Sequence, residues 1–336
     1  MNKRNINIIA CSFALLLLYG CIHEYPEEMD IQPTSVIEVE LDVLVNEDLL
    51  PLPDEARTRS IFTGYERRFI IDVYREGKVI EEKRIVATQA GESAGGKFFI
   101  PVSLKLDALK YTLVAWADYV EAGTNKDLGF ITTNLGNIPS VYPYPSESRL
   151  REAFYGTEQL DLTSYRNIEN ARTASTINMQ RTHAHYRIVT TDVDEFREML
   201  ARQNMAKQAE EYHVKVMYQY YFPTAFDAVA GTPCGSDTGV GFSLPFSLQS
   251  GCGSECEMIS DYIPANDSPL FITLTMELTD AAGKLLSRTQ GIKVPYKRGC
   301  TTTVSGRFLT TMMSGGIGLD AGYEGEYNID ISDFIK

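Results

Sequence analysis

The 336-residue sequence contains only one tryptophan and four histidines, and its basic residues are outnumbered by acidic ones. It has 31 Lys and Arg against 45 Asp and Glu, which gives a formal net charge of −14 at pH 7. A chain this acidic repels nucleic acid and anionic lipid headgroups, so neither is expected as a partner. One short apolar run near the N-terminus is too short to span a bilayer, and no other segment reaches 18 apolar residues, so no membrane crossing is expected.

Stretches with helical periodicity are also scarce, whereas Tyr, Phe, Thr and Val are plentiful, which favours β structure. Alternating patterns predict a first strand at Val36–Val45, an edge strand around Pro101, and another strand holding the only tryptophan, Trp116. Tight hairpin turns are expected at 76–77 and 280–283. Strands that recur every 8 to 15 residues predict an all-β fold of antiparallel sandwiches with minor α structure.

Only a few segments depart from this strand pattern. The stretch "TTDVDEFREMLARQ" predicts a helix that starts after Thr191, with Val193 and Phe196 on one face. The stretch "SESRLREAFYG" predicts a short helix that ends at Gly156. Between them, "STINMQRTHAHYRIVTTD" predicts a strand pair or a single bent strand. The Gly-, Ser- and Cys-rich region at 230–264 predicts mostly loop, interrupted by "VGFSLPFSL".

The N-terminus combines Lys3 and Arg4 with an apolar run that ends in Leu18-Tyr19-Gly20-Cys21. This is typical of an export signal, and the tetrad fits the bacterial lipobox, in which the cysteine becomes the lipidated first residue. We therefore expect a signal peptide at 1–20 and a lipid (palmitate) on Cys21. The alternative is a plain secretory signal with an unmodified cysteine.

The segment at 21–34 is polar, acidic and contains two prolines, which predicts a tether. An acidic tract directly after a lipidated cysteine resembles the surface-export signal of Bacteroidales lipoproteins. The remaining length suits two domains of ordinary size. We place their boundary at the predicted helix, which gives an N-terminal β-sandwich domain at 35–190 and a C-terminal one at 191–336.

Four cysteines follow the tether: Cys234, Cys252, Cys256 and Cys300. An even number in an exported chain predicts at least one disulfide, but the sequence does not choose among three pairings. A zinc site is the alternative, and the chain lacks the paired C-x-x-C spacing that such sites favour.

Motifs for catalysis and metal binding are weak. The sequence at 91–95, "GESAG", matches the G-x-S-x-G nucleophile elbow, but an alternating strand follows where that motif needs a helix. His183 and His185 share a strand face and could ligate a metal with His213, although packing is the more ordinary role of such residues. We therefore predict no enzymatic activity, no metal and no cofactor.

Several stretches together resemble the fimbrillin-like and fimbrial-anchor lipoproteins of Bacteroidales, which build or anchor type V pili. They are the lipobox with its acidic tail, "LVAWADYV", "REAFYGTEQLDL", "THAHYRIVTTD", "VPYKRGCTTTVSGRFLT" and "GIGLDAGYEGEYNIDI". The chain departs from the family at Gly299-Cys300, where Arg-Asn usually precedes the Thr-rich strand. The resemblance implies two tandem transthyretin-like β-sandwich domains, an outer-membrane location exposed at the cell surface, and adhesion through pilin or other fimbrial subunits.

In the resembled family, polymerising pilins lose their first strand by cleavage after an arginine, and a neighbour's strand fills the groove. Arg57 and Arg59 are the corresponding candidates here, and exposed loop arginines are the alternative interpretation. We expect the chain to be an anchor or a minor or tip subunit that binds partners by strand addition. An anchor should retain Val36–Val45, because cleavage would separate it from the lipid.

The alternative function is a surface glycan-binding lipoprotein of a nutrient-uptake system. Sugar-binding proteins use exposed aromatic side chains, and Tyr142, Tyr144 and Trp116 are candidates. Trp116 lies in an apolar strand, which suits a core position better.

Overall fold

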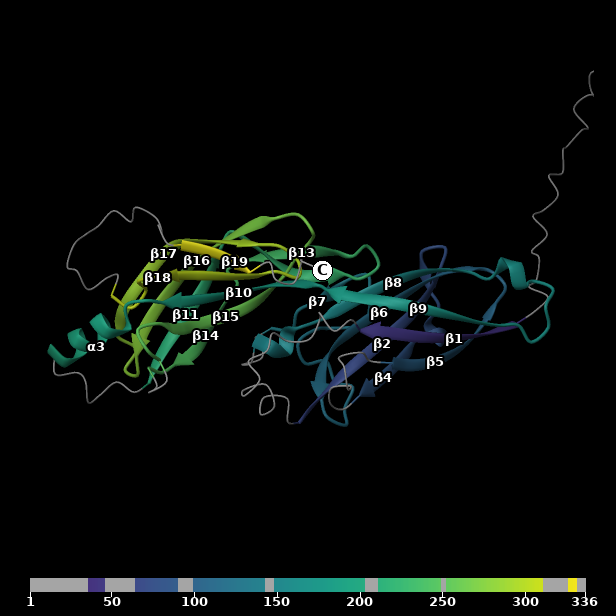
Figure 1. Cartoon of the computed structure of the whole chain (residues 1–336), viewed down its shortest axis with the longest axis horizontal. Coiled ribbons are helices and arrows are strands. Elements are labelled where there is room, and N and C mark those ends of the chain that lie inside the picture. Colours follow the sequence, from purple (N-terminus) through teal and green to yellow (C-terminus); the bar gives the residue numbers. More distant parts are fainter. Residues whose placement is uncertain are drawn as a thin grey trace, which may run out of the picture.

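The computed structural model describes residues 36–45, 64–89, 99–142, 148–202, 211–248, 252–310 and 326–330. Within these residues the fold is all-β, with one α-helix, α3 (Val193–Arg202), and short 3₁₀ turns. The strands form two sandwiches that lie end to end along the longest axis (Figure 1). The predicted all-β sandwich fold is therefore confirmed. No helix in the described part of the chain is long and apolar enough to span a bilayer.

The first sandwich comprises eight strands in one continuous hydrogen-bonded sheet, ordered β3-β2-β6-β8-β9-β1-β5, with β4 also paired to β2. The sheet doubles over at β8, which pairs with β9 at only two positions. Its two layers enclose a core that draws on most of its strands. The strands are β1 (Val36–Val45), β2 (Tyr65–Arg75), β3 (Lys78–Val79), β4 (Ile85–Gln89), β5 (Phe99–Asp107), β6 (Lys110–Glu121), β8 (Phe154–Asp161) and β9 (Arg172–Arg181).

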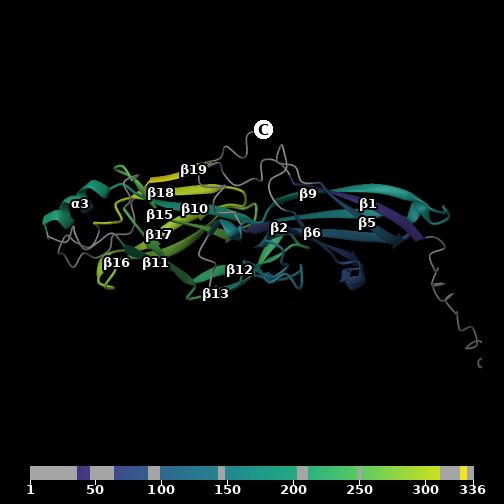
Figure 2. The same ribbon diagram turned by 90° about the horizontal axis from the view of Figure 1, so that it is seen from below.

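The second sandwich has two four-stranded sheets, ordered β15-β10-β18-β19 and β14-β11-β16-β17. The two layers are visible edge-on in Figure 2. Between them lies the larger core, which α3 closes at one end with Val193, Phe196 and Leu200. The strands are β10 (His183–Thr190), β11 (Tyr212–Gln219), β14 (Gly241–Phe246), β15 (Cys256–Pro264), β16 (Leu270–Asp280), β17 (Leu285–Tyr296), β18 (Thr301–Gly306) and β19 (Glu326–Asp330).

The two sandwiches share a junction sheet of β13 (Thr232–Thr238), β12 (Tyr221–Asp227) and β7 (Ile138–Pro139). β7 lies in the connection between β6 and β8 of the first sandwich, whereas β12 continues from β11 of the second. A third core forms here around Trp116, whose ring centroid lies 5.3 Å from that of Phe130 and 6.2 Å from that of Phe226. Trp116 is fully buried, as its place in an apolar strand indicated.

Buried polar contacts also cross the junction. Arg151 of the 3₁₀ turn Ser148–Arg151 forms an ion pair with Asp261 of β15, and both side chains are almost fully buried. Arg298 donates to the Tyr155 hydroxyl at 2.7 Å and pairs with Asp267. Because a buried charge is costly without its partner, these contacts hold the sandwiches in one arrangement.

β9 and β10 are separated only by Thr182, so one bent strand runs from the first sandwich into the second. This matches the single bent strand that the sequence allowed. β10 pairs with β15 and β18 of the second sandwich. Whether the sandwiches fold as separate domains, and where such domains would divide, stays a prediction.

Of the other local predictions, some are confirmed and others are wrong. Both hairpin turns are confirmed, as are α3 and the position of β5 at the end of its sheet. The helix expected to end at Gly156 is wrong: in the described part of that stretch only Ser148–Arg151 is helical, and Gly156 lies in β8. The region at 230–264 is also less loop-rich than expected, because β13 and β15 occupy much of it. The stretch "YHVKVMYQYYF", whose alternating pattern suits a single strand, bends at Tyr220 and forms two strands, β11 and β12.

Candidate functional site

β1 is the described strand nearest the predicted lipid, and it occupies an interior position in its sheet. It pairs antiparallel with β5 from Val36 to Leu44 and parallel with β9 from Glu38 to Val45. Ile37 is fully buried in the first core. The observed strand, Val36–Val45, has the same bounds as the predicted one.

The pairing of β5 depends on β1. In the part of the chain that the structure describes, β1 is the sheet partner of β5, and β5 ends the sheet. Removing β1 would therefore leave β5 without a ladder and would expose the edge of β9 along Arg172–Met179. Unpaired edges of this kind readily accept another strand. The β1 position is thus a place where this sandwich depends on a single segment.

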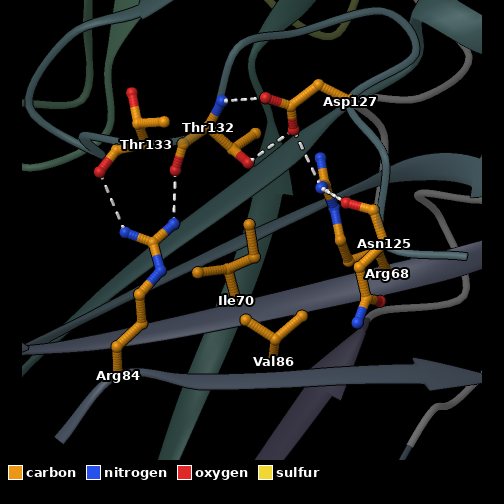
Figure 3. Close-up of a pocket in the computed structure, with 8 residues that line it drawn as sticks. All are labelled: Arg68, Ile70, Arg84, Val86, Asn125, Asp127, Thr132 and Thr133. Carbon is orange, nitrogen blue, oxygen red and sulfur yellow. Dashed lines mark hydrogen bonds and ion pairs between the residues drawn. The ribbon is translucent and has the colours of Figure 1, made fainter. Parts of the chain in front are cut away.

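A pocket of about 450 Å³ lies on the outer face of β2 and β4 (Figure 3). Ile70 and Val86 form its apolar floor, and the connection after β6 forms its rim. Arg84 donates to the backbone carbonyls of Thr132 and Thr133 and pairs with Asp72 at 3.3 Å. Burial raises the pKa of the Asp72 carboxyl, and the charge of Arg84 partly offsets this rise.

Arg68 lines the other side of this pocket. Its guanidinium forms two hydrogen bonds to Asp118, at 2.9 and 2.6 Å, and a further bond of 2.9 Å to Asp127. Burial works against the charged form, but the hydrogen bonds and charges of Asp118 and then Asp127 hold the pKa of Arg68 above its ordinary value. Three carboxylates thus face two arginines, so the pocket carries no excess positive charge for an anion. The arrangement secures the connection that carries β7.

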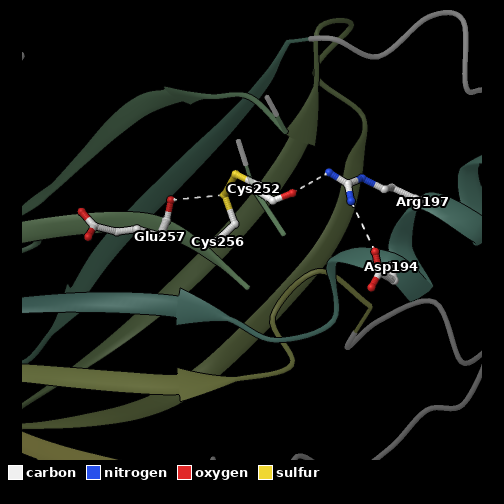
Figure 4. Close-up of a disulfide and its surroundings, with 5 residues drawn as sticks. All are labelled: Asp194, Arg197, Cys252, Cys256 and Glu257. Carbon is white, nitrogen blue, oxygen red and sulfur yellow. Dashed lines mark hydrogen bonds and ion pairs between the residues drawn. A yellow bond between two sulfur atoms is a disulfide. The ribbon is translucent and has the colours of Figure 1, made fainter. Parts of the chain in front are cut away.

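The disulfide joins Cys252 to Cys256 (Figure 4). Arg197 of α3 donates to the carbonyl of Cys252 at 3.0 Å and to the Asp194 carboxylate at 3.3 Å. The bridged loop is therefore attached to the helix that closes the second core.

The other two candidate cysteines lie elsewhere. Cys234, in β13, is partly exposed, and its thiol donates to Asn137 Oδ1 at 3.6 Å. Burial raises the pKa of this thiol, and the charge of Asp227 adds to the effect. Cys300 is buried. Among the described residues, no group of three or more His, Cys, Asp or Glu is arranged to hold a metal ion.

The candidate histidines have three different surroundings. His183 is buried against Phe130 at the junction, and its Nδ1 contacts the Thr182 hydroxyl. His185 packs on the ring of Tyr262 with centroids 4.7 Å apart. His213 is exposed on β11, in the opposite sheet of the second sandwich. The structure thus does not bring the three imidazoles together.

Several sequence-predicted positions lie outside the described residues. They are Cys21, the arginines at 57 and 59, the G-x-S-x-G segment at 91–95, and Tyr144. Lipidation and proteolytic processing therefore stay predictions.

The buried arginines of the junction were missed by sequence reasoning. Arg151 and Asp261 are separated by 110 residues, and Arg298 and Tyr155 by 143. Nothing in their local sequences distinguishes them from solvent-exposed charges. Only the register of the strands around them reveals the pairs.

The chain belongs to a family of unknown function (DUF6562), whose sequence profile matches residues 33–333. A search of curated proteins finds no match.

Solved structures with some similarity include the fimbrial anchor protein Mfa2 from Porphyromonas gingivalis, at 12% identity and a TM-score of 0.42 over 80% of this chain and 90% of that one. A candidate cell adhesion protein from Bacteroides uniformis has 12% identity and a TM-score of 0.44, over 87% and 97%. A candidate polysaccharide-binding protein from Bacteroides thetaiotaomicron has 11% identity and a TM-score of 0.40, over 75% and 79%. At TM-scores below 0.5, such similarity establishes neither a shared fold nor a shared function.

Proposed function

We propose that this protein is a lipoprotein of the outer membrane, exposed at the cell surface, that acts in adhesion as the anchor or a minor subunit of a fimbrium. Its lipid is carried by Cys21, and its role is non-enzymatic. Its partners are pilin or other fimbrial subunits, bound by β-strand addition. The observation that carries the proposal is the interior position of β1, the first described strand after the lipidation signal.

This position suits an anchor mechanically. The acidic segment at 21–34 connects the proposed lipid to β1 almost directly. A pull between lipid and fold acts along β1, and the ladders to β5 and β9 on its two sides resist it together. Many backbone hydrogen bonds then have to break at once, whereas a terminal strand at a sheet edge would be held by one ladder. The body of the protein therefore stays attached under load.

Strand addition requires an accessible sheet edge. β5 ends the first sheet, and β4 pairs with β2 alone among the described strands. The backbone N–H and C=O groups of an added strand and of such an edge satisfy one another along their length. Pro101 removes one N–H from β5, which restricts where a partner strand could pair.

Replacing the proposed lipid attachment site tests the anchor. Cys21→Ser should move the protein from the membrane fraction to the soluble fraction and should release co-purifying fimbrial subunits with it. Cys234→Ser, at a partly exposed cysteine in β13, is the matched control and should leave fractionation unchanged. Unaltered membrane retention of Cys21→Ser would refute lipid anchoring. If the parent protein stays in the membrane fraction but no fimbrial subunit co-purifies with it, the fimbrial role is refuted.

A further inference from the structure

Three exposed tyrosines border one bend in the second sandwich. Tyr220 and Tyr221, at the bend between β11 and β12, are 76% and 73% exposed. Tyr142 is 64% exposed, and its hydroxyl donates to the carbonyl of Gly241 at 3.1 Å. Gly241 pairs with Met217 of β11, shortly before the bend. The Tyr142 hydroxyl, from a separate part of the chain, therefore lies beside the strands that flank the bend.

Tyr220 is held there in an unfavourable backbone conformation. Its φ is +62°, in the left-handed region that glycine or asparagine usually occupies. Among the described residues, the other two non-glycine positions with positive φ are Glu76, in a two-residue hairpin turn, and Asn170, a residue type that tolerates the conformation. A bulky ring at such a position adds strain with no gain in burial. Strain of this kind concentrates at functional sites.

Buried aromatic residues on both sides of Tyr220 hold the bend in place. Tyr218 and Phe222, on either side of Tyr220, stack with ring centroids 3.9 Å apart. The Tyr218 hydroxyl donates to Asp261 at 2.6 Å, and its backbone N–H donates to the carbonyl of Val240. Tyr220 and Tyr221 therefore sit on a buried scaffold, so little order has to be gained when a ligand binds.

The size and charge of this surface indicate the class of ligand. Three tyrosine rings at these exposures offer about 400 Å², roughly half of what each partner contributes to a typical protein–protein interface. Around the bend, the segments at 218–224 and 236–242 contain a single charged residue, Asp237. The absence of a basic side chain from these segments disfavours phosphorylated, sulfated or acidic ligands. A neutral ligand with both an apolar face and many hydroxyls fits best.

We propose that Tyr142, Tyr220 and Tyr221 form a platform that binds a neutral oligosaccharide. The C–H face of a pyranose ring packs on the electron-rich face of a tyrosine, and the phenol hydroxyls can donate to and accept from sugar hydroxyls. The inference rests on the proposed adhesive function and names the ligand class that such adhesion would use.

The test compares binding with folding. The full chain, purified in detergent, is titrated calorimetrically with neutral oligosaccharides of glucose, galactose, mannose or xylose, and with sialylated and sulfated oligosaccharides for comparison. Tyr220→Gly should lower affinity for the neutral sugar about tenfold. Its melting temperature should equal or exceed that of the parent, because glycine adopts the left-handed conformation without strain. Tyr221→Ala should also lose affinity.

Ile168→Ala is the matched control. Ile168 is 50% exposed in the first sandwich, between β8 and β9, whereas the bend lies between β11 and β12 of the second. This variant should bind like the parent. The proposal is refuted if no neutral oligosaccharide binds, if only anionic sugars bind, or if Tyr220→Gly binds unchanged. None of these outcomes depends on the lipid or on fimbrial subunits. The sugar-binding test and the Cys21→Ser test can therefore fail independently of each other.

Discussion

The ion pair between Arg151 and Asp261 allows the strongest test of how the two sandwiches are joined. Arg151 comes from the 3₁₀ turn before β8, and Asp261 lies in β15 of the second sandwich. Their side chains are 1% and 2% exposed. Asp261 also accepts from the Tyr218 hydroxyl at 2.6 Å and from the Tyr262 backbone N–H at 2.8 Å. Without Arg151 the carboxylate keeps these two neutral donors but loses the positive charge that compensates its burial.

Removing one partner should be costly, because it leaves the other charge buried and uncompensated. We expect Arg151→Met or Asp261→Asn alone to lower the free energy of unfolding by about 3–5 kcal/mol. The double variant leaves no unpaired charge, so its loss should be smaller than the sum of the two, by about 1–3 kcal/mol. Arg202→Met breaks an exposed pair with Glu198 in α3 and should cost less than about 0.5 kcal/mol.

The assay uses the only tryptophan as a reporter. Trp116 is buried at the junction beside Phe226 of β12, so its fluorescence follows separation of the sandwiches during urea unfolding. Far-ultraviolet circular dichroism follows the strands of the whole chain. In the parent the two signals should change together, and in the single variants the fluorescence should change at lower urea. Strictly additive losses in the double variant, or coincident transitions in every variant, would refute the view that this pair couples the sandwiches.

Three further predictions follow from individual sites. Gly156→Ala should cost about 1–3 kcal/mol, because its Cβ would come within 2.6 Å of a carbonyl oxygen in β9, whereas Gly253→Ala, with open space around it, should be nearly neutral in urea unfolding. Burial, and then the charge of the neighbouring arginine, hold the pKa of His183 well below its ordinary value. The unfolded chain therefore binds a proton more readily below about pH 6.5, and stability falls as the pH drops through that range. His183→Gln should reduce this fall in stability, whereas the control His213→Gln, at an exposed position, should not. The measurement is the urea midpoint across pH. If the midpoint falls equally with pH in the parent and in His183→Gln, the assignment is contradicted. Reduction of the disulfide that closes the "CGSEC" loop should cost about 2 kcal/mol by calorimetry, and finding all four of the later cysteines as thiols in non-reducing mass spectrometry would contradict the bridge.

The parts of the fold that sequence predicted are those governed by local pattern. β1 alternates apolar and acidic residues, and its bounds match the prediction. The apolar periodicity of α3 and the turn at Glu76-Gly77 were similarly readable. In each case a few neighbouring residues carry enough information to fix the element.

The parts that sequence missed depend on distant partners. β13 has the composition of a loop, yet it forms a strand because β12 supplies its ladder. Gly156 resembled a helix end, but the close approach of β9 requires a glycine in the strand at that point. The bend at Tyr220 contradicts the conformational preference of tyrosine, so no local rule would place it there.

The most direct test of the proposed anchor role is N-terminal analysis of the protein taken from the native cell surface. If the chain is an anchor, its mature form begins at a lipidated Cys21 and retains β1, Val36–Val45, in its interior place between β5 and β9. Cleavage after Arg57 or Arg59 would instead separate both the lipid and β1 from the rest of the fold. A mature start at Cys21 is the result that we predict, and a mature start at residue 58 or 60 would contradict the anchor role.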